Sequence, residues 1–140
     1  MLQQFYPTPP PHKYRYELHK DMNFSAAHFI PNEKAGPCMN IHGHTYFVNL
    51  TIAGDELDEM GFLINFKELK TLVHGRFDHR IMNEQMLEIP STEQVAEEIW
   101  VSVQQHLGTL PNRPTCIQVV VRETPTSYVV YRPKEVMPID

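Results

Sequence analysis

Three histidines lie where an extended chain would bring their side chains together. His42 and His44 are separated by one glycine, and alternate residues of a strand point to the same side, so both imidazoles can reach one point. His28 ends an earlier stretch in which Phe24 and Ala26 share its side. If the two stretches pair antiparallel, His28 supplies a third nitrogen. Three neutral imidazoles leave a zinc ion with an open fourth position, an arrangement typical of catalytic sites.

The pair of histidines also has a simpler interpretation, because such pairs occur on exposed strands without a metal. The third histidine, and a cysteine four residues before the pair, favour the metal site. That cysteine, Cys38, follows a loop rich in glycine and proline. A free cysteine is more often a buried apolar residue, whereas a loop position beside a cation favours the thiolate and a role as a base. Cys116 lies in a valine-rich segment and is interpreted as a core residue.

Two other places carry groups that could do chemistry. Asp78 and His79 are an acid next to a titratable base, but adjacent residues of a strand face opposite ways, so a direct bond between them requires a turn. A solvated surface pair is an equal alternative. Glu123 ends a strand just before Thr124. Its carboxylate is either a solvated strand end or an acceptor of two hydrogen bonds from a guanidine-like edge, such as that of a pterin or guanine.

Hydrophobic periodicity predicts the elements that must position these groups. Alternation predicts strands over residues 14–28, 44–53, 115–123 and 127–132. Helical spacing predicts one helix over about 66–74, ended by Gly75, and a second that Ser91 caps and Gly108 ends. Residues 77–83 are ambiguous. The predicted fold class is α+β, with a four-stranded antiparallel sheet and two helices on one face.

Length and composition limit the function. A chain of 140 residues fits one domain, which we expect over residues 14–140, preceded by a proline-rich arm over residues 1–13. A net charge of −5 argues against nucleic acid or anionic membrane as partners. No apolar run approaches the roughly 20 residues of a bilayer span, and the start lacks a signal-peptide pattern. With only two cysteines, we expect a cytoplasmic protein without disulfides.

The chain resembles the 6-pyruvoyl-tetrahydropterin synthase superfamily over about residues 14–132. Five motifs in order carry the resemblance: Phe24-Ser-Ala-Ala-His28, Cys38-x-x-x-His42-Gly-His44, Phe77-Asp-His79, Pro90-Ser-Thr-Glu93 and Val121-Arg-Glu-Thr124. The three residues between Cys38 and His42 favour the 6-carboxy-5,6,7,8-tetrahydropterin synthase branch, because pyruvoyl synthases typically have a longer insertion there. One departure is Asn65, where relatives commonly have aspartate.

The resemblance implies the T-fold, in which subunits associate to close a barrel, usually as a homohexamer with active sites at subunit interfaces. Open sheet edges in a monomer independently favour an oligomer. The roles that the resemblance implies are zinc ligands at His28, His42 and His44, proton transfer by Cys38, a relay of Asp78 and His79 lent by a neighbouring subunit, and a pterin anchor at Glu123 with Thr124 beside it.

The implied reaction converts 7,8-dihydroneopterin triphosphate to 6-carboxy-tetrahydropterin, acetaldehyde and triphosphate, on the way to queuosine and other 7-deazaguanines. One alternative is a pyruvoyl synthase, which eliminates triphosphate without cleaving a carbon–carbon bond. Another is a zinc- or pterin-binding module without catalysis, against which the intact Cys38, Asp78 and His79 argue. A zinc hydrolase fits less well, because the sequence has no His-Glu-x-x-His helix.

Overall fold

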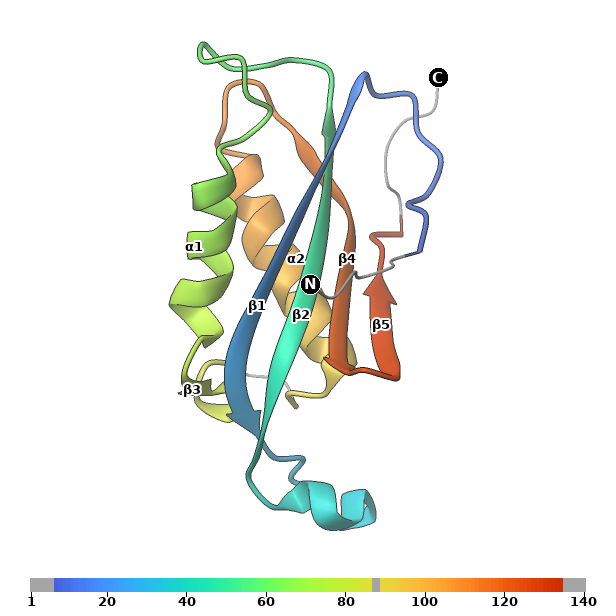
Figure 1. Cartoon of the computed structure of the whole chain (residues 1–140), viewed down its shortest axis with the longest axis vertical. Coiled ribbons are helices and arrows are strands. Elements are labelled where there is room, and N and C mark those ends of the chain that lie inside the picture. Colours follow the sequence, from blue (N-terminus) through green and yellow to red (C-terminus); the bar gives the residue numbers. More distant parts are fainter. Residues whose placement is uncertain (1–6, 87–88, 135–140) are drawn as a thin grey trace.

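The computed structural model describes residues 7–86 and 89–134. It contains one sheet and two α-helices, with short 3₁₀ segments between them (Figure 1). The strands are β1 (Tyr16–His28), β2 (His42–Gly54), β3 (Arg80–Ile81), β4 (Thr115–Thr124) and β5 (Ser127–Tyr131). The helices are α1 (Phe66–Phe77) and α2 (Thr92–Leu107), and the 3₁₀ segments are η1 (Glu33–Met39) and η2 (Met82–Glu84).

The sheet has the strand order β3-β1-β2-β4-β5. Strands β1, β2, β4 and β5 pair antiparallel, as predicted, and β3 pairs parallel to β1 at Ala26 and Ala27. The sheet therefore has five strands, and the prediction of four was wrong. The extra strand falls in the stretch 77–83 that had no clear pattern. Two residues are too few for alternation to show.

Strands β1 and β2 form a long hairpin, and its register determines which residues of the two strands lie opposite each other. They pair along their whole length, and Phe24 lies opposite Tyr46, Ala26 opposite His44 and His28 opposite His42. The antiparallel pairing that the histidine prediction required is therefore present. Segment η1 and its flanking residues connect the two strands at the end of the sheet that carries the histidines (Figure 1).

Both helices cover the same face of the sheet, and the core lies between the two layers (Figure 1). The fully buried side chains of β2 on this face alternate as predicted: Tyr46, Val48, Leu50 and Ile52. Helix α1 continues through Gly75 to Phe77, so the predicted end at residue 74 was wrong. A Cβ at Gly75 would meet nothing within 4 Å, and Phe77 extends the buried stripe one turn past Val73. The buried stripe outweighs the modest cost of a helical glycine.

Helix α2 matches its prediction at both ends. The Ser91 side chain accepts the Gln94 N–H as the N-cap, and the last helical residue is followed by Gly108. Cys116 is fully buried opposite this helix, and burial raises the pKa of its thiol to about 12, which fits an inert core residue. Within the described residues, neither helix has the length and apolar character needed to span a bilayer.

The described part of the proline-rich arm, residues 7–13, makes contacts with the face of the sheet that the helices leave open. Gln118 Nε2 donates to the Pro7 carbonyl at 3.1 Å, and the Arg132 guanidinium donates to the Thr8 carbonyl at 3.4 Å. Gln118 is fully buried although it is polar. The arm therefore supplies a hydrogen-bond partner that this buried amide requires.

Candidate metal and catalytic site

The three predicted ligands converge at one end of the core-facing side of the sheet. His28 of β1 lies directly across from His42 of β2, and His44 lies two pairs further along, opposite Ala26. The ring centroids are 4.5 to 5.2 Å apart, and all three rings meet edge to face. His28 is 3% exposed, so the site begins inside the core rather than on the surface.

Backbone carbonyls fix the proton positions on two of these rings. His28 Nδ1 lies 2.7 Å from the Pro90 carbonyl oxygen, and His42 Nδ1 lies 2.7 Å from the Asn40 carbonyl oxygen. A carbonyl only accepts, so each Nδ1 must carry a hydrogen. In the neutral rings the Nε2 atoms are then bare lone pairs, yet they face each other at 2.9 Å. Two such atoms repel each other unless a cation or proton lies between them.

His44 and Glu123 complete the cluster. His44 Nε2 lies 2.9 Å from Glu123 Oε1, but it is buried and makes no hydrogen bond of suitable geometry. The same carboxylate oxygen is 3.3 Å from His28 Nε2. Burial lowers the pKa of His44, and the rings of His28 and His42 add to this effect, while Glu123 opposes it. A lowered pKa keeps His44 neutral, which is the protonation state of a metal ligand.

Glu123 is aimed at the histidines by two elements. It lies one residue beyond the Phe47–Arg122 pair of β2 and β4, so alternation puts it on the core-facing side with His44. Thr92, the first residue of α2, donates its hydroxyl to Glu123 Oε2 at 2.7 Å. Thr124 is half-buried at the β4–β5 turn, where its hydroxyl bonds Thr126.

This donor set fits a divalent metal ion. Four residues bring potential ligand atoms together: His28, His42, His44 and Glu123. One nitrogen or carboxylate oxygen from each lies within 4.8 Å of the others, and the described residues contain no other such group. Imidazole nitrogens with one carboxylate suit Zn²⁺. The carbonyls that hold Nδ1 of His28 and His42 provide the outer partners that orient metal-binding histidines.

Sequence reasoning missed three contributors to this site. Thr92 positions the Glu123 carboxylate, the Pro90 carbonyl orients His28, and the Tyr46 hydroxyl lies 3.3 Å from His28 Nδ1. The motif Pro90-Ser-Thr-Glu93 contains two of them, so the signal was present in the chain. Burial next to Glu123 raises the pKa of Tyr46, so this hydroxyl keeps its proton.

Among the described residues, Cys38 is not part of the group of possible metal ligands. It is exposed near the end of η1, and its backbone carbonyl accepts the Ile30 N–H at 2.7 Å. That bond closes the connection between β1 and β2 and holds Cys38 at the end of the sheet where His28 and His42 lie. An exposed thiol is available to a reactant, unlike the buried Cys116.

Asp78 and His79 form the turn between α1 and β3, which removes the strand-geometry objection to their contact. Their closest side-chain atoms, Asp78 Oδ2 and His79 Nε2, are 3.5 Å apart. The His79 side chain is 83% exposed. The backbone N–H of Ser25 donates to Asp78 Oδ1, and this bond is the main reason that the pKa of Asp78 lies below the ordinary carboxyl value.

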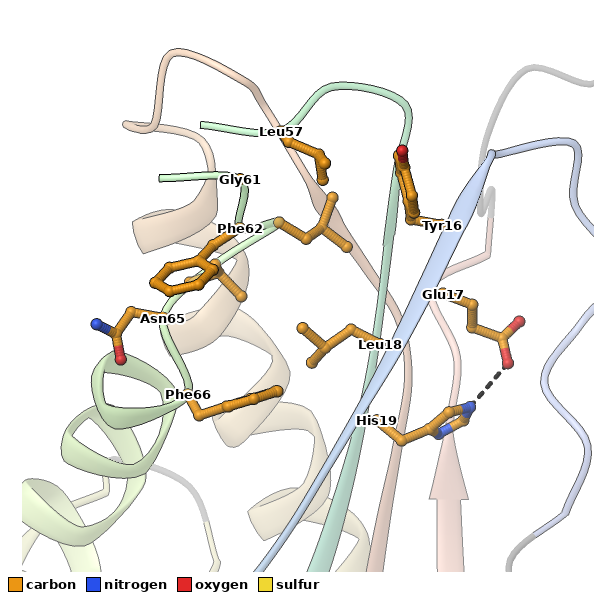
Figure 2. A pocket seen from close by; sticks show the side chains of 11 residues that line it. Tyr16, Glu17, Leu18, His19, Leu57, Gly61, Phe62, Asn65 and Phe66 are labelled. Atoms are coloured by element: carbon orange, nitrogen blue, oxygen red, sulfur yellow. Dashed lines mark hydrogen bonds and ion pairs between the residues drawn. The ribbon is translucent and has the colours of Figure 1, made fainter. Parts of the chain in front are cut away.

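The described chain has other hollows besides the centre of the cluster. One, of about 520 Å³, adjoins the cluster: His44 lines it together with His79 and Arg80. Its lining also includes Ser25 and Thr45, whose side chains alternate to the opposite face of the sheet. Another, of about 570 Å³, lies at the far end of β1 (Figure 2). Its apolar side chains include Leu18 and Phe62, while Glu17 and His19 point to the other side of the strand. This second hollow has no catalytic constellation, so we assign the chemistry to the histidine cluster.

Comparison with known proteins agrees with this geometry. A family model described as 6-pyruvoyl tetrahydropterin synthase matches residues 17–134. The chain is 57% identical to the 6-carboxy-5,6,7,8-tetrahydropterin synthase of Bacillus subtilis, an alignment that covers 96% of this chain and 97% of that protein. It is 30% identical to the protein of the same name from Synechocystis, covering 87% and 97% of the two chains.

Solved structures show the same fold. The 6-pyruvoyl tetrahydropterin synthase of Caenorhabditis elegans aligns with a TM-score of 0.68 at 23% identity and covers 85% of this chain and 96% of that one. The Plasmodium vivax protein of that name aligns with a TM-score of 0.60 at 23% identity, covering 84% and 97%. The predicted T-fold is therefore confirmed for the single chain. By its sequence match and its fold, this chain belongs to the 6-pyruvoyl tetrahydropterin synthase family.

Proposed function

We propose that this protein is a 6-carboxy-5,6,7,8-tetrahydropterin synthase, which converts 7,8-dihydroneopterin triphosphate to 6-carboxy-tetrahydropterin, acetaldehyde and triphosphate. The observation that carries the proposal is the convergence of three imidazole Nε2 atoms, two of them with their protons held on Nδ1 by carbonyls. The high identity to the Bacillus subtilis protein supports the carboxy branch. So does the short spacing between Cys38 and His42.

In the proposed mechanism His28, His42 and His44 would hold Zn²⁺. The bound ion supplies a Lewis acid that polarises the side-chain oxygens of the substrate. The Glu123 carboxylate anchors the pterin by accepting hydrogen bonds from the amino-pyrimidinone edge of the substrate. The Thr92 hydroxyl holds Oε2 of this carboxylate in place. Because Oε1 of Glu123 also lies among the histidines, this carboxylate joins the pterin subsite to the metal subsite.

Proton transfer falls to groups that surround this cluster. Cys38 acts as a base on one side of the substrate, and Asp78 with His79 forms the relay. The exposure of the His79 side chain supports donation of the relay to the site of a neighbouring subunit. We therefore propose a homo-oligomer, a hexamer as in the family, acting in the cytoplasm in queuosine synthesis.

The direct test supplies purified, zinc-loaded protein with 7,8-dihydroneopterin triphosphate and identifies the products by mass spectrometry. We expect 6-carboxy-tetrahydropterin and acetaldehyde in equal amounts. Formation of 6-pyruvoyl-tetrahydropterin without acetaldehyde would instead identify the pyruvoyl branch. Unchanged substrate, with zinc bound, would leave a binding module and contradict the proposal.

A further inference from the structure

The turn after α1 places Asp78 between two imidazoles. Asp78 Oδ2 lies 3.5 Å from His79 Nε2 and 3.6 Å from His74 Nδ1, both within ion-pair distance. The other carboxylate oxygen, Oδ1, accepts the Ser25 N–H at 3.0 Å. His74 and Asp78 are 27% and 24% exposed, so both are more shielded from solvent than His79.

One ring nitrogen of His74 is already committed. Its Nε2 lies 2.6 Å from the backbone carbonyl oxygen of Asn23, which can only accept a hydrogen bond. Nδ1, which faces Asp78, therefore carries a hydrogen only in the doubly protonated ring. That cation would lie in the last turn of α1, where the helix dipole stabilises positive charge. His74 thus presents either a lone pair or a positive N–H to the carboxylate, and only the second attracts it.

The backbone of His79 is held in an uncommon conformation by the same residues. His79 has a φ of 59°, in the left-handed region that side chains other than glycine seldom adopt. Its N–H donates to the Ser25 carbonyl at 2.6 Å, and Ser25 returns its own N–H to Asp78. Two bonds to one residue of β1 therefore hold the backbone at His79, and with it the direction of the bond from Cα to Cβ.

We propose that His74 is a positioning residue for the proton relay, acting on His79 through the Asp78 carboxylate that it holds in place. This inference rests on the proposed function, in which Asp78 and His79 move protons. Besides the two imidazoles and the Ser25 amide, the charged group that acts on Asp78 is Lys70 of α1. The positive charges of His79, His74 and Lys70 add to the Ser25 bond in lowering the pKa of Asp78.

The first test is the substitution His74→Gln. The introduced amide would keep a donor for the Asn23 carbonyl but bring no charge to Asp78. We expect a fall in kcat of about tenfold or more, the usual effect of losing a partner that orients a reacting group, with KM and zinc content unchanged. His74→Arg keeps a positive charge and should regain most of the lost turnover. The control is His106→Gln, because His106 also pairs with a carboxylate, that of Glu68, remote from the relay.

A double-mutant cycle separates action through Asp78 from a merely structural role. Asp78→Asn keeps an oxygen to accept the Ser25 N–H but removes the charge. If His74 acts through Asp78, the double variant His74→Gln/Asp78→Asn should be no slower than Asp78→Asn alone. Losses of kcat that multiply would overturn the inference.

A readout on His79 itself does not depend on turnover. With His74 neutralised, the Asp78 charge acts on His79 alone, so the NMR titration midpoint of the His79 ring should rise in zinc-loaded His74→Gln and stay unchanged in His106→Gln. If the wild type fails to turn over the pterin triphosphate, the proposed function fails, and the titration still decides whether His74 and His79 are coupled. An active wild type with unaltered kcat and an unaltered midpoint in His74→Gln would overturn the inference. If His74→Gln does not fold, the neutral variant His74→Asn takes its place in the kinetics and in the titration.

Discussion

At the scale of single residues, the histidine cluster consists of atoms that repel one another. Bare Nε2 lone pairs of His28 and His42 face each other at 2.9 Å, and the Glu123 carboxylate is turned toward the same point. Such an arrangement is stable when a cation occupies its centre, and binding then adds to the stability of the native state.

Replacing His42 by alanine removes one of three proposed nitrogen ligands. We expect His42→Ala to lose most of its bound zinc after dialysis, because two imidazoles hold the ion far more weakly than three. Elemental analysis of the purified variant measures this directly. The control is His19→Ala, since His19 contacts Glu17 and Thr51 rather than the cluster. A zinc content equal to that of the wild type would contradict the ligand assignment.

A substitution at Cys38 should affect turnover without affecting zinc binding. Cys38 is exposed and lies outside the metal cluster, so Cys38→Ala should fold normally and keep its zinc. Loss of a positioned base typically slows turnover by about 10² to 10⁴. Steady-state kinetics with 7,8-dihydroneopterin triphosphate measure the effect, and undiminished kcat would remove Cys38 from the mechanism.

Glu123 is within reach of both subsites, and a single substitution distinguishes its two roles. We expect Glu123→Ala to weaken binding of a pterin analogue by about tenfold or more, because a charged bidentate acceptor is lost. Zinc affinity should change much less, since three histidines remain. Parallel titrations with the analogue and with zinc provide the comparison. A larger loss in zinc affinity would make Glu123 primarily a metal ligand.

At the scale of elements, the bond between Asp78 and Ser25 attaches the end of α1 to β1. The pKa of Asp78 is lower in the folded protein than in the unfolded chain, where an aspartate titrates near 3.9. Its stabilising effect is therefore fully present above about pH 4 and is lost as the pH falls through the lower, folded value. Stability between pH 5 and pH 3 should decline less steeply in Asp78→Asn than in the wild type.

Urea unfolding at several pH values measures this dependence. Asp78→Ala, which also loses the hydrogen bond, should be less stable by about 1 kcal/mol at neutral pH. Equal pH slopes for Asp78→Asn and the wild type would show that the carboxylate does not link acid stability to this turn.

The elements differ in how far their residues predicted them. The long alternation of β2 and the capped stripe of α2 gave correct positions, because burial on one face selects apolar residues at regular spacing. Strand β3 could not be predicted, because it has only two residues and they pair with Ala26 and Ala27, which lie far away in the sequence. The convergence of the three histidines was predicted from the spacing of His42 and His44, together with an assumed antiparallel pairing with the strand that His28 ends. Thr92 was not, because its contact with Glu123 joins residues far apart in the sequence.

At the scale of the whole molecule, the outer edge of β1 is left largely unpaired in the described sheet. Strand β3 pairs only with Ala26 and Ala27. Ser25 directs its N–H outward to Asp78, so by alternation the N–H of Asp21 also points outward, away from β2. An unpaired edge of this length readily pairs with another strand, and the proposed homo-oligomer would use it.

Substitution at this edge tests the assembly. Asp21→Pro removes an outward N–H without removing a bond to β2. We expect the wild type to sediment as a multiple of its 16.3 kDa chain, and Asp21→Pro to sediment as smaller species. Asp21→Ala is the matched control, because it loses the same carboxylate contact to Asn49 but keeps the N–H. A monomeric wild type, or an unaffected proline variant, would exclude this edge from the interface.

The hydrogen bond from His28 to the Pro90 carbonyl has a consequence for how the protein responds to chelation. Pro90 immediately precedes the Ser91 cap of α2, so the ring that we propose as a zinc ligand also contacts the residue before the start of that helix. Withdrawing the ion would free His28 to turn and would loosen its hold on this carbonyl. Chelation would then affect more than the proposed reaction, because the first turn of α2 would fray where it contacts the sheet.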